Sequence, residues 1–291
     1  MKNYYKKIAI VTDSSSDIPS ELVKNLAIDI VPMYIGYEGD MKKDGLEITT
    51  EEVFGALRKG IKVHTSSPSA GDFYKTFKEL LTEKDFDYVI CIILSSKLSG
   101  SFNAASIAKN NLGDDRIKIV DSKTSTLCLG LIVLQAARAA REGMPAVEIE
   151  EIIYSLIEKN RFIAILENFE YVLKGGRTSF FGKILNKALR FTPILTIGRN
   201  GKVHLKKFTK NLDSAFKEIY NYAVSEAKKY SSSKIGIFYG EDPKAALKLE
   251  KLLRENREIQ IDELIISKIT TVISAHTGPG IWGIAISPSI K

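Results

Sequence analysis

The sequence has few of the residues that build metal centres, disulfide frameworks or the common catalytic loops. Its 291 residues include two cysteines, Cys91 and Cys128, which lie in apolar surroundings and form no CxxC pair. Buried, reduced thiols are therefore expected, and a disulfide or zinc framework is not. The three histidines lack metal-ligand spacing. Neither a GxxxxGK[ST] nor a GxSxG motif occurs, so we expect no cofactor and no metal.

Long hydrophobic runs are also missing. The longest nearly unbroken one, residues 127–137, is about half of the ~20 apolar residues that span a bilayer. The apolar stretch at 8–11 is too short for the core of a secretory signal peptide. Hydrophobic residues make up 44% of the chain and charged residues 26%, which is typical of globular proteins. These features predict a cytoplasmic protein without a transmembrane segment, and they leave transient contact with a membrane surface open.

The formal net charge of +7 is concentrated in one part of the chain. Residues 1–150 hold 19 basic and 21 acidic side chains, whereas residues 151–210 alone hold 12 basic and 4 acidic ones. A local excess favours a docking face for an acidic partner, or a landing zone for a phosphate donor, over general affinity for nucleic acid. The basic segment also lacks an RNP, zinc-finger or helix–turn–helix signature, so we expect no nucleic-acid partner. A merely solvated basic surface is the alternative.

The order of predicted elements indicates an α/β fold with two domains. In the first half, the patterns predict strands at 8–11, 28–37, 88–94 and 117–120 and helices at 19–25, 49–59, 69–81, 101–109 and 127–141. This rhythm predicts a largely parallel sheet flanked by helices. The second half is α+β: a helix at 145–159, strands at 162–166, 194–197, 203–208, 234–238 and 263–268, and helices at 212–229 and 243–256. We place the boundary near residue 160, which gives domains 1–160 and 161–291.

Three clusters of hydroxyl side chains occur where predicted strands end or helices begin. They are residues 13–17 (DSSSD), 64–69 (HTSSPS) and 95–101 (SSKLSGS). In open α/β sheets, ligands bind beyond the carboxyl ends of the strands, where hydroxyls and free backbone N–H groups can hold an anion. Helix capping and turns explain any single cluster more readily. Three clusters in one half of the chain favour a site.

Two glycine-containing segments add candidate groups. Residues 174–177 (KGGR) permit a tight turn that presents Arg177, whose guanidinium can bind a carboxylate or phosphate through two parallel hydrogen bonds. A helix C-cap followed by a solvated charge is the alternative there. Residues 274–283 place His276 among small residues, where a backbone can approach a ligand closely and the imidazole can donate to an anion. A structural histidine is the alternative at this position.

These segments, in this order, resemble the DegV family of bacterial fatty-acid-binding proteins. The similarity runs from residues 8–14 (IAIVTDS) to residues 276–280 (HTGPG), so it covers a unit of about 8–287. The family's TSxPS element is matched by residues 65–69, and its SSxLSG element by residues 95–100. Its KGGR and HTGxG elements are matched by residues 174–177 and 276–280. Each element is weak alone, whereas the ordered set is specific.

The resemblance implies two α/β domains with a tunnel between them that holds a long-chain fatty acid such as palmitate. It implies that Thr65 and Ser99 bind the carboxylate and that His276 lies near it. Ser96 and Gly278, from the same elements, join the candidate ligand-binding residues. It further implies a carrier that presents the acid to a separate fatty-acid kinase for acyl-phosphate formation, so the protein itself is not expected to be an enzyme. Arg177 becomes a candidate contact for the partner or for phosphate.

One departure from the family pattern concerns this kinase. Relatives often carry an arginine, linked to kinase coupling, after the strand at 203–207, and Phe208 occupies that position here. Lys207 and Lys210 supply charge but not the bidentate fork of an arginine. A different class of function, a serine hydrolase or acyltransferase that uses Ser99 or Ser96 with His276, is the alternative; no residue spacing supports it.

Overall fold

The computed structural model describes residues 7–168, 171 and 191–290, and its core is built from two sheets. The first sheet is four-stranded and parallel, with the order β2-β1-β6-β7. Its strands are β2 (Asp29–Val31), β1 (Ile8–Asp13), β6 (Tyr88–Ile93) and β7 (Ile117–Asp121). Helices α3 (Ala70–Lys78) and α4 (Ser101–Leu112) cover one face through a cluster that includes Phe73 and Ala105. A 3-10 turn (Ser14–Ser16) and α1 (Ser20–Asn25) follow β1, and a π-helical turn (Glu79–Glu83) extends α3.

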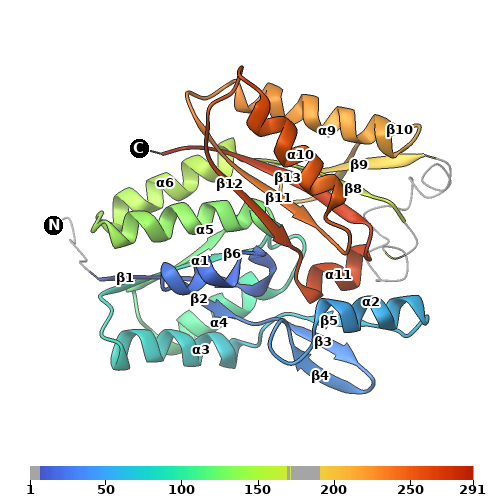
Figure 1. Ribbon diagram of the computed structural model, residues 1–291. Helices are drawn as coiled ribbons and strands as arrows, with labels where there is room; N and C mark the ends of the chain where they lie inside the picture. Colours follow the sequence, from blue (N-terminus) through green and yellow to red (C-terminus); the bar gives the residue numbers. More distant parts are fainter. Residues whose placement is uncertain (1–6, 169–170, 172–190, 291) are drawn as a thin grey trace.

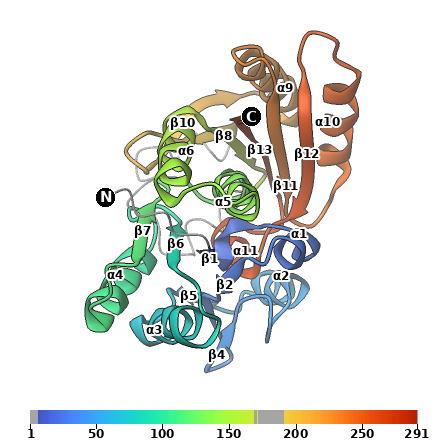
Figure 2. The same ribbon diagram turned by 90° about the vertical axis from the view of Figure 1, so that its left-hand side faces the viewer.

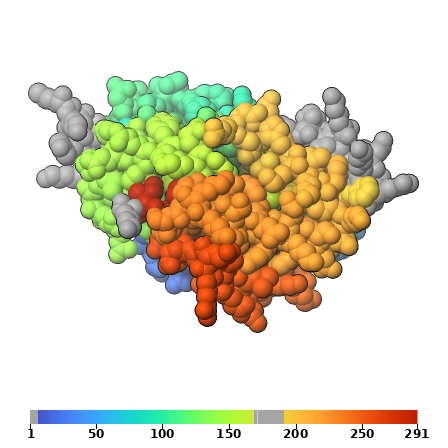
Figure 3. All heavy atoms as spheres, turned by 90° about the horizontal axis from the view of Figure 1, so that it is seen from above, coloured from blue at the N-terminus to red at the C-terminus, as the bar shows by residue number. Residues whose placement is uncertain are grey.

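The second sheet is six-stranded and mixed, with the order β10-β9-β8-β13-β11-β12. Its strands are β8 (Arg161–Leu166), β9 (Thr192–Ile197), β10 (Val203–Thr209), β11 (Ser233–Tyr239), β12 (Ile261–Lys268) and β13 (Ile281–Pro288). Only β11 and β12 pair in parallel; the other neighbours are antiparallel. Helices α9 (Leu212–Ala227) and α10 (Lys244–Glu255) cover the outer face, which dominates the view from above (Figures 1 and 3).

One helix, α5 (Thr126–Arg141), lies between the two sheets, beside α6 (Ala146–Lys159) (Figures 1 and 2). It contacts β1 of the first sheet and β11 and β13 of the second. Nearly all of its residues are buried, because apolar side chains occupy every side of the helix. The largest hydrophobic cluster accordingly joins residues of both sheets.

A smaller antiparallel sheet, β4-β3-β5, lies beside α2 (Thr50–Arg58) and α11 (Thr271–Thr277). Its strands are β4 (Asp40–Lys43), β3 (Tyr34–Tyr37) and β5 (His64–Ser66). Helix α2, which the sequence predicts, begins with a capping box in which Thr49 and Glu52 exchange side-chain-to-backbone hydrogen bonds. Ser69 and Asp72 do the same for α3. The second cap fixes the start of α3 directly after the segment 64–69.

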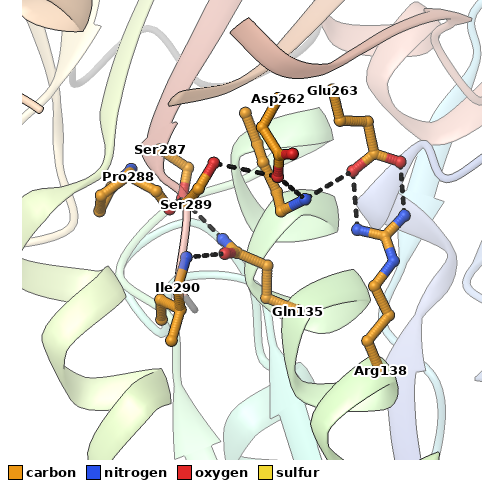
Figure 4. Close-up of polar contacts among 9 residues, drawn as sticks. Gln135, Arg138, Asp262, Glu263, Ser287, Pro288, Ser289 and Ile290 are labelled. Carbon is orange, nitrogen blue, oxygen red and sulfur yellow. Dashed lines mark hydrogen bonds and ion pairs between the residues drawn. The ribbon is translucent and has the colours of Figure 1, made fainter. Parts of the chain in front are cut away.

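A polar network connects the C-terminal half of α5 to the last strands of the chain (Figure 4). Gln135 donates to the hydroxyl of Ser287 at 2.9 Å and accepts from the N–H of Ile290 at 3.2 Å. Arg138 binds both carboxylate oxygens of Glu263 on β12. Lys234 lies between Asp262 and Glu263, so the two cations and two carboxylates neutralise one another.

The predicted α/β class with a parallel sheet flanked by helices is confirmed, and the exceptions have clear causes. The single strand predicted at 28–37 is wrong: it divides at Pro32, which has no N–H to donate, into β2 and β3 of different sheets. Strand β13 was not predicted, and neither was the short helix α11, which contains His276 and ends one residue after it. The domain boundary stays a prediction; it falls at Asn160, between α6 and β8.

Candidate functional site

A cavity of about 380 Å³ lies beyond the carboxyl ends of the parallel strands. This volume is in the range of small-molecule sites. Segments after β6 and β7 form one side, the inner face of β8 and β9 forms another, and α11 closes a third. Most of the lining is apolar: Met33, Leu94, Leu98, Phe162, Ala164, Leu166, Leu195, Ile197, Val203, Val272, Ile273 and Ile281.

Strand β8 gives the cavity its direction. Alternate side chains of this strand, Phe162, Ala164 and Leu166, face the cavity, as the two-residue period of a strand requires. Leu166 pairs with Ile281, close to the end of α11, whereas Phe162 pairs with Ala285 further along β13. The Phe162 ring stacks on Phe238, with ring centroids 5.3 Å apart. The cavity wall formed by β8 therefore runs from the end near α11 toward the stacked rings of Phe162 and Phe238.

At the α11 end, the cavity becomes polar. Thr65 lies on β5, held by pairing of that residue with Ile35 of β3, and His276 lies in the last turn of α11. Thr65 Oγ1 and His276 Nε2 are 2.8 Å apart, and both residues line the cavity. A hydroxyl and an imidazole from positions 211 residues apart are thus brought together by the fold.

Ser99 lies in the same polar end, within a chain of hydroxyls. Its Oγ is 2.8 Å from Oγ of Ser67 and 2.9 Å from Oγ of Ser101. The N–H of Gly100 donates to Ser67 Oγ at 3.1 Å, and the N–H of Ser101 donates to Ser99 Oγ at 3.2 Å. Thr65, Ser67 and Ser99 all line the cavity, so two of the three predicted hydroxyl clusters meet there.

Other predicted site residues lie elsewhere or act indirectly. Ser96 is not among the lining residues; its hydroxyl donates to Asp121 at 2.6 Å and its N–H to the same carboxylate at 3.2 Å. Gly278 ends α11 with φ +71°, and a Cβ there would lie 2.3 Å from the Tyr171 ring, so only glycine fits this turn. Arg177 and its KGGR element lie outside the described residues.

The first hydroxyl cluster, residues 13–17, lies outside the cavity lining and forms a hydrogen bond to the start of α11. The Asp17 carboxylate accepts the N–H of Thr270 at 2.8 Å, and Asp44 accepts the N–H of Thr271 at 3.0 Å. Asp13 accepts the N–H of Leu94, just before the cavity-lining turn. Burial raises the pKa of all three carboxyls: that of Asp13 to about 6, and that of Asp17 well above its ordinary value. These acids position the site's walls.

Some lining residues were not singled out from the sequence. Ser125 and Thr126, at the start of α5, border the cavity. They belong to a further hydroxyl-rich stretch, residues 122–126, which follows β7 as the other clusters follow their strands. Their position directly after a predicted strand could have marked these residues as part of the site. Among residues 7–168, 171 and 191–290, no group of three or more His, Cys, Asp or Glu side chains is arranged to hold a metal.

Comparison with known proteins identifies the family. A family model described as the uncharacterised protein family DegV matches residues 7–289. This chain belongs to the DegV family. A DegV domain-containing protein of Caldanaerobacter subterraneus is 36% identical over 279 residues, which cover 96% of this chain and 98% of the relative.

Solved DegV structures share the fold. A fatty-acid-binding DegV protein from Thermus thermophilus superposes with a TM-score of 0.91 at 28% identity, covering 97% of this chain and all of that one. A Thermotoga maritima protein, whose structure is described as revealing a fatty-acid-binding function, gives a TM-score of 0.84 at 26% identity, covering 98% of this chain and all of that one.

In this DegV chain, the hydrogen bonds do not favour a serine–histidine hydrolytic pair. The imidazole Nε2 of His276 is engaged by Thr65, while the hydroxyl of Ser99 lies between those of Ser67 and Ser101. A nucleophilic serine needs its base within hydrogen-bond reach. The arrangement instead offers several hydroxyl donors at the end of an apolar cavity.

In the part of the chain that the structure describes, no helix is long and apolar enough to cross a membrane.

Proposed function

We propose that this protein binds a long-chain fatty acid such as palmitate, with its carboxylate at Thr65 and Ser99 and its acyl chain along β8. The observation that supports this most directly is a cavity with hydroxyls at one end and apolar side chains elsewhere. Fatty-acid binding by the Thermus and Thermotoga relatives supports it independently.

The energetics fit this assignment. Burying an acyl chain of 16 carbons at ~0.8 kcal/mol per CH₂ gives a gross gain of about 11 kcal/mol, before the costs of ordering and desolvation. A buried carboxylate without hydrogen bonds would remove much of this gain. Hydroxyl donors from Thr65 and Ser99 offset that cost. The anchor thus sets the orientation, and the apolar wall supplies most of the affinity.

We further infer that the protein is a carrier and that a separate fatty-acid kinase phosphorylates the bound carboxylate. The polar end of the cavity is bordered by the exposed Ser66, so a partner can reach a head group held there. Phe208, where relatives often carry arginine, is half-buried on the edge strand β10, with its ring centroid 6.3 Å from that of Phe191. Of the two lysines that could supply charge in its place, Lys207 is ion-paired with Glu218 at 2.7 Å. Lys210, which is exposed, is therefore the better candidate for contact with a kinase.

Native mass spectrometry of the purified protein, followed by palmitate titration, tests the binding function. We expect a co-bound mass of a fatty acid, and an affinity about tenfold or more weaker for the Thr65→Val/Ser99→Ala variant, since each removes a hydrogen bond to a charged group. Ser96→Ala is the matched control, because that hydroxyl is bound to Asp121 outside the cavity lining. Equal affinities for all three proteins would reject the site.

The carrier role needs a separate assay. Loaded protein is mixed with a bacterial fatty-acid kinase and ATP, and acyl phosphate is measured. Tight palmitate binding without acyl phosphate, across several such kinases, would reject the carrier role and leave the binding function standing.

A further inference from the structure

Ser67 lies at a position that the TSxPS pattern leaves open, yet the structure places it in direct contact with the anchor. It lines the cavity beside Thr65, and its Oγ is 2.8 Å from Oγ of Ser99. The N–H of Gly100 donates to Ser67 Oγ at 3.1 Å. A serine hydroxyl has one proton and two acceptor sites. With one acceptor site of Ser67 filled by Gly100, its own proton has the Ser99 oxygen within hydrogen-bond distance.

Ser99 is surrounded by donors in the same way. The N–H of Ser101 donates to Ser99 Oγ at 3.2 Å, and the Ser67 hydroxyl can fill the second acceptor site. Ser99 must then donate its single proton outward, either to the Ser101 hydroxyl at 2.9 Å or to a ligand. An ionised carboxylate is an acceptor only, and hydrogen bonds to charged acceptors are about twice as strong as neutral ones. A carboxylate therefore takes the Ser99 proton.

We propose that Ser67 is a positioning residue, which fixes the direction of the Ser99 proton and thereby makes the site selective for an ionised carboxylate. The proton order runs from the Gly100 N–H to Ser67, from Ser67 to Ser99 and from Ser99 to the ligand. This inference rests on the proposed fatty-acid function. A head group that itself donates a proton, such as an alcohol, gains nothing from this order, because it can bind with the chain of hydroxyls reversed.

The test compares palmitate with hexadecanol in the wild type and in the Ser67→Ala, Ser99→Ala and double variants. We expect Ser67→Ala to weaken palmitate binding about five- to tenfold, the size of one hydrogen bond acting on a charged group. Hexadecanol affinity should change less than about twofold, because the alcohol does not depend on the proton order. In the Ser99→Ala background, removing the Ser67 hydroxyl should have no further effect, since Ser67 acts through Ser99.

Two further measurements separate positioning from a general packing role. Titration of bound palmitate labelled with ¹³C at its carboxyl carbon should show a higher pKa in Ser67→Ala than in the wild type, because the Ser99 proton is no longer held toward the charged form. Ser67→Thr should restore the wild-type value. Ser96→Ala is the matched control: it removes a serine hydroxyl that lies outside the cavity lining and donates to Asp121 at 2.6 Å.

Three results would overturn the proposal: equal losses for palmitate and hexadecanol, an undiminished effect of Ser67→Ala in the Ser99→Ala background, or no change in palmitate affinity. These differ from failure of the proposed function, in which the wild type would bind no palmitate at all.

Discussion

Filling the middle of the cavity should shorten the acyl chain that the protein accepts. Ala164 is buried and faces the cavity between Leu166 at the polar end and Phe162 at the far end. Replacing it with phenylalanine would place a ring across the path along β8. Such a substitution tests the orientation of the chain as well as its location.

The magnitude follows from the strand geometry. Phe162 lies two residues beyond Ala164, which is about 6.6 Å at ~3.3 Å per residue. With C–C bonds of about 1.5 Å, an extended alkyl chain advances about 1.3 Å per carbon, so about five CH₂ groups lose their place. At ~0.8 kcal/mol each, Ala164→Phe should cost palmitate about 4 kcal/mol. That is a rise in Kd of nearly three orders of magnitude.

Isothermal titration with palmitate and with decanoate checks this. Decanoate, which is six carbons shorter, should bind Ala164→Phe within about threefold of its affinity for the wild type, because the blocked section lies beyond its methyl end. Ile163→Val is the matched control: Ile163 lies on the opposite face of the same strand, in a different hydrophobic cluster. Unchanged palmitate affinity in Ala164→Phe, or equal loss of both acids by a variant with native circular dichroism, would refute the proposed chain path.

Two predictions concern stability. Burial raises the pKa of Asp13 from 3.8 to about 6, so between about pH 4 and 6 the folded state keeps a proton that the unfolded state releases. The free energy of unfolding contributed by this group therefore falls as pH rises through that window. In urea unfolding, the loss of stability between pH 4.5 and 7 should be smaller for Asp13→Asn than for the wild type by up to about 2 kcal/mol, and an identical loss in both proteins would exclude this role. In Gly283→Ala, the new Cβ would lie 2.4 Å from the Ile163 carbonyl oxygen, so we expect thermal unfolding to show a free energy of unfolding lower by about 1–3 kcal/mol. Gly55→Ala, with open space around its Cβ, should instead raise it by up to about 1 kcal/mol. Equal effects of the two substitutions would contradict the close approach at Gly283.

Strand β13 shows why part of the fold was not visible in the sequence. It is buried along its whole length, between β8 and β11, so it lacks the alternation of a half-exposed strand, and Gly283 also interrupts the kind of continuous apolar run that marks β6. Gly283 and Pro288 further resemble loop composition. The glycine is needed because the Phe238 ring and the β8 backbone approach it closely, which is a property of the assembled sheet. By contrast, β6 and α5 were predicted because their apolar runs have distinct lengths.

The candidate site was visible as far as its residue types, but not in its contacts. The segments 65–69 and 95–100 indicated hydroxyls at strand ends, and Thr65, Ser67 and Ser99 do border one cavity. Nothing in the spacing distinguishes Ser99 from Ser96, three positions earlier. The difference arises because Asp121, at the end of the neighbouring strand β7, binds the Ser96 hydroxyl. Such pairing depends on which strands lie side by side.

The position of α5 has a consequence for how the molecule opens and for how it can be divided. Because both sheets cover this helix, neither half of the chain can separate without exposing one of its apolar sides to water. The two sheets should therefore lose their structure in one cooperative transition, and the amide protons of α5 should be among the last to exchange with solvent. The two halves of the sequence, expressed separately, are each expected to be insoluble, even though each contains a complete sheet.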